Sequence, residues 1–451
     1  MRIQGIVILG LAGWIAAGEA AAWTGGWGVW TGGGLTIYTN AGEGEARRVA
    51  AGLAEMSEAM GAVWGPLPEM APPARVYVFK DMAGLRAMGA RGFSKGFFQS
   101  GPDYDVIAVL GGEGDTVRSA RHEYVHRVLH RTARRVPSWM EEGLAEMYST
   151  LGRDGERWVV GLPVAAHVEM LRRLGWVGLE ELARMPEDPR TWDRAEGVIR
   201  YYGQSWAVVH YLAVGSERAE RFAGLLRRVQ AGEEVEAALQ AEYGMGGEAA
   251  VAEARVRVES GRMVVRRMAG AAGRGSKVEG QWRLLDEEEA GVVLAELAVA
   301  TGQRGSDEEY LRTLRRAAKG SARAKVGVGL LALRKGAKEE AERQFRAAVA
   351  EGVEEPAAWF ELAMLVRDRE GATAEVVRML QRVVELNPAH GEALYLLAME
   401  EQRAGRGEAA AGLLEQAVGA LPRQFVFREA LARVYWELER QYRSVVRHHH
   451  G

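Results

Sequence analysis

Two histidines and several glutamates form the part of the sequence best suited to chemistry. His122 and His126 lie four residues apart, so on a helix both side chains project from one face and can bind one metal ion. Glu123 follows the first histidine, where its carboxylate can reach a water on that metal. Glu142, sixteen residues after His126, lies in a second predicted helix and can supply a third ligand. Three protein ligands leave one position open on zinc, so this pattern predicts a catalytic zinc site.

The second predicted helix carries two adjacent glutamates, and only one of them can be the third ligand. Ser138 is followed three residues later by Glu141, which is typical of a capping box in which the glutamate folds back onto the helix start. Glu142 lies about 100° further around the helix and is free to face the metal. Glu146 lies one turn later on the same face, so we expect it to accept the outer N–H of a ligating histidine and to fix its tautomer.

These two segments resemble the gluzincin metallopeptidases. The HExxH sequence at 122–126 and the later Trp-x-x-Glu-Gly-x-Ala-Glu at 139–146 are similar in particular to the peptidase MA-like domains, and more distantly to the zinc aminopeptidases and thermolysin. The resemblance spans roughly residues 34–265. It implies that His122, His126 and Glu142 bind Zn²⁺. It also implies that Glu123 is the general base, which takes a proton from a zinc-activated water and passes it to the leaving amine of the peptide.

The resemblance also bears on the oxyanion donor and on specificity. The aminopeptidases place a tyrosine where it can bind the oxyanion, and Tyr202 resembles that residue. They also have a Gly-x-Met-Glu-Asn strand whose glutamate binds a free amine. The corresponding strand here, expected over 105–110, lacks that sequence, so aminopeptidase specificity is not supported. An edge strand at this point could still pair with an extended peptide substrate by β-addition. Endo- and exopeptidase action both stay open.

Other polar residues near the motif have structural interpretations. A fourth protein ligand would close the zinc site, so we interpret His130 as a residue that contacts a ligand or lies in the core. His167 and His210 lie in predicted helices and are interpreted as core residues. Arg131 belongs to a basic cluster after the motif helix, which is interpreted as a solvated helix end.

The N-terminal residues predict an export signal. Arg2 precedes a mostly apolar run over 3–17, and small residues follow at 20–22, which indicates a signal peptide over 1–22 that is cut before Trp23. We therefore expect a periplasmic or extracellular protein, with membrane contact only if the signal stays uncleaved. The absence of cysteine excludes thiol nucleophiles and cysteine-ligated zinc. The net charge of −3, without a basic block, gives no reason to expect nucleic-acid binding.

Periodicity divides the rest of the chain into two parts. Short strands are expected over 35–39, 76–79 and 106–110, a helix over 43–63, and mostly helix from 164 to about 265. This pattern and the motif predict an α+β zincin-like metallopeptidase domain over 23–268. Small residues over 270–276 indicate a linker, which we place at 269–282.

Beyond the linker the sequence repeats. Pairs of residues that include a small one recur at 294–295, 328–329, 362–363, 397–398 and 431–432, with spacings of 34, 34, 35 and 34. This period resembles the tetratricopeptide repeat, a pair of helices with small residues where the helices cross. We predict an all-α repeat solenoid over 283–447 and a tail over 448–451. The solenoid is expected to bind a protein partner or substrate.

Two functions from different classes fit this sequence. The first is an exported zinc metallopeptidase that hydrolyses peptides or proteins and carries a repeat domain for binding. The alternative is a catalytically inactive adaptor that keeps the peptidase fold and acts through its tetratricopeptide repeats. The sequence favours the enzyme, because the two histidines, the third ligand and the base are all present.

Overall fold

The computed structural model describes residues 26–449 except 65–66, 68–71, 91, 93, 113–114, 188–194, 270–277 and 303–306. The predicted signal peptide over 1–22 and most of the predicted linker lie outside the described residues, so both stay predictions. Among the residues that are described, no helix combines the length and apolar character needed to span a membrane.

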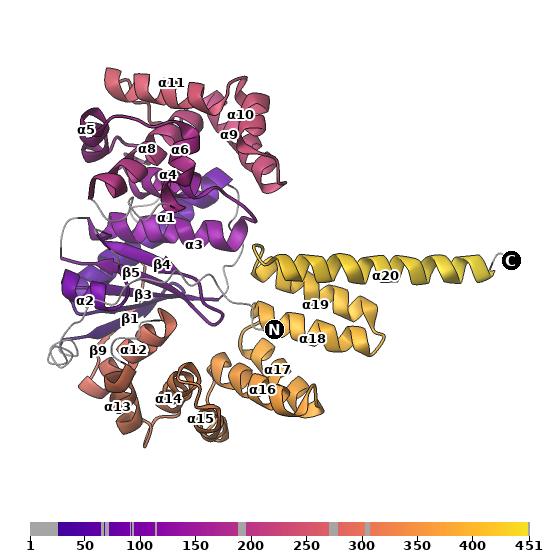
Figure 1. Cartoon of the computed structure of the whole chain (residues 1–451). Coiled ribbons are helices and arrows are strands. Elements are labelled where there is room, and N and C mark those ends of the chain that lie inside the picture. Colours follow the sequence, from indigo (N-terminus) through magenta and orange to yellow (C-terminus); the bar gives the residue numbers. More distant parts are fainter. Residues whose placement is uncertain are drawn as a thin grey trace.

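A small mixed sheet forms the centre of the N-terminal part (Figure 1). Its strand order is β4-β5-β3-β2-β1-β9, with β2, β3 and β5 parallel and the other neighbouring pairs antiparallel. The strands are β1 (Gly28–Gly32), β2 (Leu35–Thr39), β3 (Ala74–Phe79), β4 (Gly96–Gln99), β5 (Asp105–Leu110) and β9 (Gln281–Leu284).

Helices cover both faces of this sheet because its strands alternate apolar side chains between them. Val76 and Val78 face the core that holds α1 (Glu43–Trp64) and α3 (Thr116–Thr132). Tyr77 and Phe79 face the opposite way, toward α2 (Met82–Ala87) and the first helices after the predicted linker. The sheet is therefore a layer between the motif helix and the beginning of the repeats.

Six of the nine described strands were not predicted, and two of them, β4 and β9, change two expectations. The strand predicted over 105–110 is β5, which lies inside the sheet, so the expectation that it is an edge strand is wrong; β4 forms that edge. Strand β9 includes the end of the predicted linker and pairs antiparallel with β1. The linker prediction of 269–282 is therefore wrong at its C-terminal end, because pairing with β9 covers the backbone of β1 that would otherwise be an open edge.

A helical layer packs over the motif helices, in agreement with the predicted helices from 164 onward. A short sheet of three strands, β6-β7-β8, borders it. The second motif helix is α4 (Ser138–Ser149). The helical layer and the short sheet consist of β6 (Gly152–Asp154), β7 (Arg157–Val160), α5 (Ala165–Leu174), α6 (Leu179–Arg184), the 3-10 turn η2 (Met185–Glu187), α8 (Ala195–Ala213), α9 (Ser216–Gln230), α10 (Val235–Tyr243), α11 (Gly247–Ser260) and β8 (Arg266–Ala269).

The C-terminal part consists of successive helix pairs, as the 34-residue period predicted. Ala341, Phe345 and Ala348 are fully buried where the helices of one pair cross. A Cβ atom on Gly329 would lie 2.5 Å from the Phe345 ring, so the small residue is required by the close approach. The helices are α12 (Glu287–Ala300), α13 (Asp307–Ala317), α14 (Ala322–Arg334), α15 (Lys338–Ala350), α16 (Pro356–Glu370), α17 (Ala374–Leu386), α18 (Gly391–Arg403), α19 (Gly407–Ala420) and α20 (Phe425–His449).

The helix pairs form a curved row beside the sheet domain, and α20 extends away from the body (Figure 1). Helix α20 continues to His449, so the predicted tail over 448–451 is wrong for its first two residues, which continue the last helix. Taken together, the chain is mostly helical, with a small mixed sheet near its N-terminus and tetratricopeptide-like pairs at its C-terminus.

Candidate metal centre

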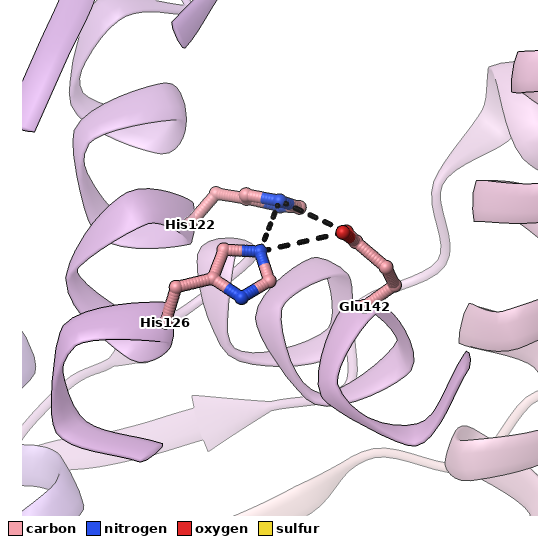
Figure 2. A group of neighbouring side chains, drawn as sticks. All are labelled: His122, His126 and Glu142. Carbon is pink, nitrogen blue, oxygen red and sulfur yellow. Dashed lines mark hydrogen bonds and ion pairs between the residues drawn. The ribbon is translucent and has the colours of Figure 1, made fainter. Parts of the chain in front are cut away.

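Helices α3 and α4 bring the predicted ligands together. The buried side of α3 includes Val125 and Val128, which pack into the core against the sheet, so the histidines on another side of the helix point toward α4. Helix α4 is fixed by the buried Trp139 and Leu144. Figure 2 shows the two histidine rings and the carboxylate of Glu142 converging from these helices.

The spacing of the donor atoms suits a tetrahedral metal ion. His122 Nε2 lies 3.1 Å from His126 Nε2. Glu142 Oε2 lies 3.3 Å from His122 Nε2 and 3.5 Å from His126 Nε2. Zinc bonds of 2.0–2.1 Å at tetrahedral angles place ligand atoms about 3.3–3.4 Å apart. Among the described residues, these three side chains are also the group of possible metal ligands whose donor atoms lie close enough together to hold one ion.

The surroundings of Glu142 support the same interpretation. Its Oε2 atom is buried, and its polar neighbours among the described residues are the Nε2 atoms of His122 and His126, at 3.3 and 3.5 Å. A buried carboxylate needs a positive partner, and a metal ion held between these three donor atoms would be one. The side chains of His122, His126 and Glu142 are 14%, 16% and 19% exposed, so the group is sheltered but reaches solvent.

Glu146 connects the site to a second layer of polar residues. Its Oε1 atom lies 3.4 Å from His122 Nδ1, the ring nitrogen turned away from the other donors, where a carboxylate can fix the tautomer. Its Oε2 atom accepts hydrogen bonds from Arg118 at 2.7 Å and from His167 Nε2 at 2.9 Å. The interpretation of His167 as only a core residue is therefore wrong, and its distance from the motif in sequence concealed this contact.

The charges at the site are strongly coupled. Burial lowers the pKa of His122, but Glu142, Glu146 and Glu123 outweigh burial and raise it to about 9. Burial opposes ionisation of Glu146 as well, yet His167 and His122 lower its pKa to about 2. For Glu142, the nearby His126 and His122 overcome burial and hold the pKa well below its usual range. The site therefore keeps two carboxylates charged, and a divalent cation would displace protons from the imidazoles.

Glu123 lies at the site but outside the ligand set. It is 8% exposed, and burial raises its pKa above the ordinary value although His122 and His126 oppose this. Strand β4 passes directly beside it: a Cβ atom on Gly96 would lie 3.0 Å from Glu123 Oε1. A carboxyl with a raised pKa beside a metal site suits a general base.

Tyr202, the predicted oxyanion donor, lies on α8 next to the ligands. Its ring centroid is 6.2 Å from that of His122, so the structure brings it into the same group. Burial, with Glu142, Glu123 and Glu146 adding to it, raises the Tyr202 pKa well above its ordinary value and keeps the phenol protonated.

Two predictions around the motif differ from the structure, and a third keeps one of its two alternatives. Helix α4 has Pro137 as its N-cap without a side-chain cap, so the capping box of Ser138 and Glu141 is wrong; Glu141 instead pairs with Arg423 of the repeats. Arg131 is not a solvated helix end: its side chain is 3% exposed and pairs with Asp105. His130 contacts no predicted ligand among the described residues, which leaves the core alternative: its Nδ1 atom is buried, and its ring lies 5.8 Å, centroid to centroid, from that of Phe98.

Comparisons with known proteins place the site inside one matched segment. Residues 116–234 match the family described as "Protein of unknown function (DUF1570)", a stretch that begins with α3 and includes Glu142 and Tyr202. No curated protein matches the chain.

Solved tetratricopeptide-repeat structures resemble part of the chain. The crystal structure of MamA has 16% identity, covers 30% of this chain and 80% of its own, and gives a TM-score of 0.26. A second MamA structure has 17% identity, covers 35% of this chain and 90% of its own, and gives a TM-score of 0.28. The crystal structure of the APC/C hetero-tetramer Cut9–Hcn1 has 11% identity, covers 70% of this chain and 52% of its own, and gives a TM-score of 0.28. These scores are low, and the description of the repeats rests on the helix pairs and their period.

Proposed function

We propose that this protein is a zinc-dependent metallopeptidase that hydrolyses peptide bonds. The observation that carries this proposal is the convergence of His122, His126 and Glu142, with donor atoms 3.1–3.5 Å apart. A zinc ion held by these residues would supply a Lewis acid and lower the pKa of a water at its open position to near 7.

The chain's own residues have distinct roles in this proposal. Glu123 accepts a proton from the attacking water and delivers it to the leaving amine. Tyr202 keeps its phenolic proton and donates a hydrogen bond to the oxyanion. Glu146 holds the His122 ring through Nδ1.

Strand β4 supports a peptide as the substrate. It is the last strand at its end of the sheet, and among the described residues no other strand pairs with its outer side. An extended peptide can add to such an edge through backbone hydrogen bonds, which would lay its carbonyl groups beside Glu123. We also propose that the repeats bind a protein partner or substrate and that the chain is exported.

Metal content and one substitution test the proposal. We expect close to one zinc per chain after gentle purification, and a loss of zinc in His126→Ala. Glu123→Gln should keep the zinc but lower the hydrolysis of a peptide library by roughly 10²–10⁴-fold, the usual contribution of a general base. Substoichiometric zinc in the parent would favour the inactive adaptor instead. A Glu123→Gln variant as active as the parent would remove Glu123 as the base.

A further inference from the structure

The repeat domain contacts the metal-site domain along one edge of its helix row. The helices α14, α16, α18 and α20 begin at Ala322, Pro356, Gly391 and Phe425, spaced by 34, 35 and 34 residues. Residues just before the starts of α18 and α20 make the contacts described below. The repeat period thus brings equivalent positions before α18 and α20 to the other domain.

One set of contacts fixes the C-terminal half of α3. Asn387 Nδ2, just before α18, donates to Pro102 O at 2.9 Å in the loop between β4 and β5. Asp105, at the end of that loop, is completely buried and accepts from Arg127 Nε at 3.0 Å and from Arg131 Nε at 3.1 Å. Both arginines lie on α3, which also carries the two histidines, and Arg131 Nη1 reaches Ala420 O of the repeats at 3.4 Å.

A second set of contacts joins α3 to α4. Arg423, in the turn before α20, donates from Nε to Ala133 O at 3.2 Å, and Ala133 is the C-cap of α3. The same guanidinium pairs through Nη2 with Glu141 in the first turn of α4. Glu141 immediately precedes the predicted ligand Glu142. One side chain in the turn between α19 and α20 therefore binds both of the helices that supply ligands.

The ligand geometry depends on how these two helices sit relative to each other. His122 and His126 come from α3 and Glu142 from α4, so a shift of one helix changes both distances from Glu142 to the imidazoles. The guanidinium of Arg423 holds a fixed fork of donors and spans the junction between the helices. Its partner Glu141 is 19% exposed, so the ion pair is partly shielded from water and salt.

We propose that the repeat domain is an internal brace for the metal centre, with Arg423 as a positioning residue that sets Glu142 against the two histidines. This inference rests on the proposed zinc site. It assigns the turn between α19 and α20 a role in the geometry of the site and gives Glu141 a function other than capping.

The test measures metal binding by the full-length protein. Zinc affinity is obtained by competition with a chelator, and the visible spectrum of the Co²⁺-substituted protein reports the ligand geometry. Arg423→Gln and Glu141→Gln each remove one charge of the ion pair between these two residues. Each should weaken zinc binding by about tenfold, the lower end of the effect of removing outer contacts of a metal site, and should alter the cobalt spectrum. The double variant should be no weaker than Arg423→Gln, because the pair between Arg423 and Glu141 is already lost in that variant.

Two further variants separate positioning from general damage. Arg423→Lys keeps the charge beside Glu141 and should restore part of the affinity. Arg406→Gln removes an exposed ion pair with Glu401 inside the repeats and should leave affinity and spectrum unchanged. If both Arg423→Gln and Glu141→Gln match the parent in affinity and spectrum, the brace is refuted while the zinc site stands. If the parent itself binds no zinc, the proposed function and the brace both fall.

Discussion

At the scale of single residues, Glu146 is the side chain that orders the polar layer behind the ligands. It contacts His122, His167 and Arg118 at once, so its two oxygens join the motif helix to α5. Its charge is held by these neighbours, which lower its pKa to about 2 against the effect of burial. A neutral amide at this position cannot accept all three contacts.

We therefore expect Glu146→Gln to weaken zinc binding by roughly 10–100-fold, the usual effect of losing an outer partner of a ligating histidine. Chelator competition measures this directly. The exposed Glu169→Gln, on the same helix as His167, removes a carboxylate nearby and should bind zinc as the parent does. Equal affinities for the two variants would mean that Glu146 does not support His122.

The residues near the motif also show how far sequence reasoning reaches. Donors four apart on one helix are a local relation, and the structure brings His122, His126 and Glu142 together as that spacing implies. The role of Glu141 could not be predicted this way. Its partner Arg423 lies 282 residues away, and a local capping rule offered a plausible but wrong alternative.

At the scale of elements, strand β4 brings backbone against the proposed general base. A Cβ atom on Gly96 would lie 3.0 Å from Glu123 Oε1, from Ala108 O and from Val109 Cγ1. Ala108 O belongs to the backbone, so the groups that can give way are the Glu123 carboxylate and the Val109 side chain. The absence of a side chain at Gly96 is therefore part of how the strand accommodates Glu123.

Gly96→Val should lower kcat for peptide hydrolysis by roughly 10–100-fold while leaving zinc content unchanged, because a displaced base loses part of its contribution. Gly61→Val adds the same atoms to α1 at a position with no neighbouring atom within 4 Å, and it serves as the control. A Gly96→Val enzyme with the parent's kcat would show that β4 does not set the position of Glu123.

Elements differed in how well the sequence predicted them. The long helices and the strands β2, β3 and β5 carry their own periodicity and were predicted. Strands β1, β4, β6, β7, β8 and β9 are three to five residues each and were missed. β9 becomes a strand through pairing with β1, roughly 250 residues earlier in the chain. A local sequence pattern cannot predict a pairing partner that far away.

At the scale of the whole molecule, the two predicted parts share one core. Side chains on one face of the sheet pack in the same cluster as α12, α13 and α14, so the first repeats complete the sheet domain. The 34-residue period predicted the solenoid, but nothing in a periodic pattern indicates what the solenoid touches. The union of the parts depends on non-periodic residues, including Arg75, which donates to Glu296 of α12 at 3.1 Å.

Asp103 makes this union sensitive to pH. Burial between the β4–β5 loop and the repeats raises its pKa from 3.8 to about 7, although the Ala357 backbone amide and Arg75 oppose the shift. Glu361 and Glu392 face it and add to the rise, and His390 lies 3.8 Å away. His390 is itself held neutral by burial, which lowers its pKa to about 4.

The sign of the pH effect follows from the folded pKa lying above the unfolded one. Between about pH 4 and pH 7 the unfolded chain has released the Asp103 proton while the folded chain retains it, so this residue's contribution to stability falls as the pH rises and levels off above pH 7. Asp103→Asn cannot ionise, and the other groups are common to both proteins. The free energy of unfolding of the variant minus that of the parent, from urea titrations, should therefore be larger at pH 8 than at pH 5 by roughly a few kcal/mol at most. The same difference at both pH values would show that Asp103 is not buried against the repeats.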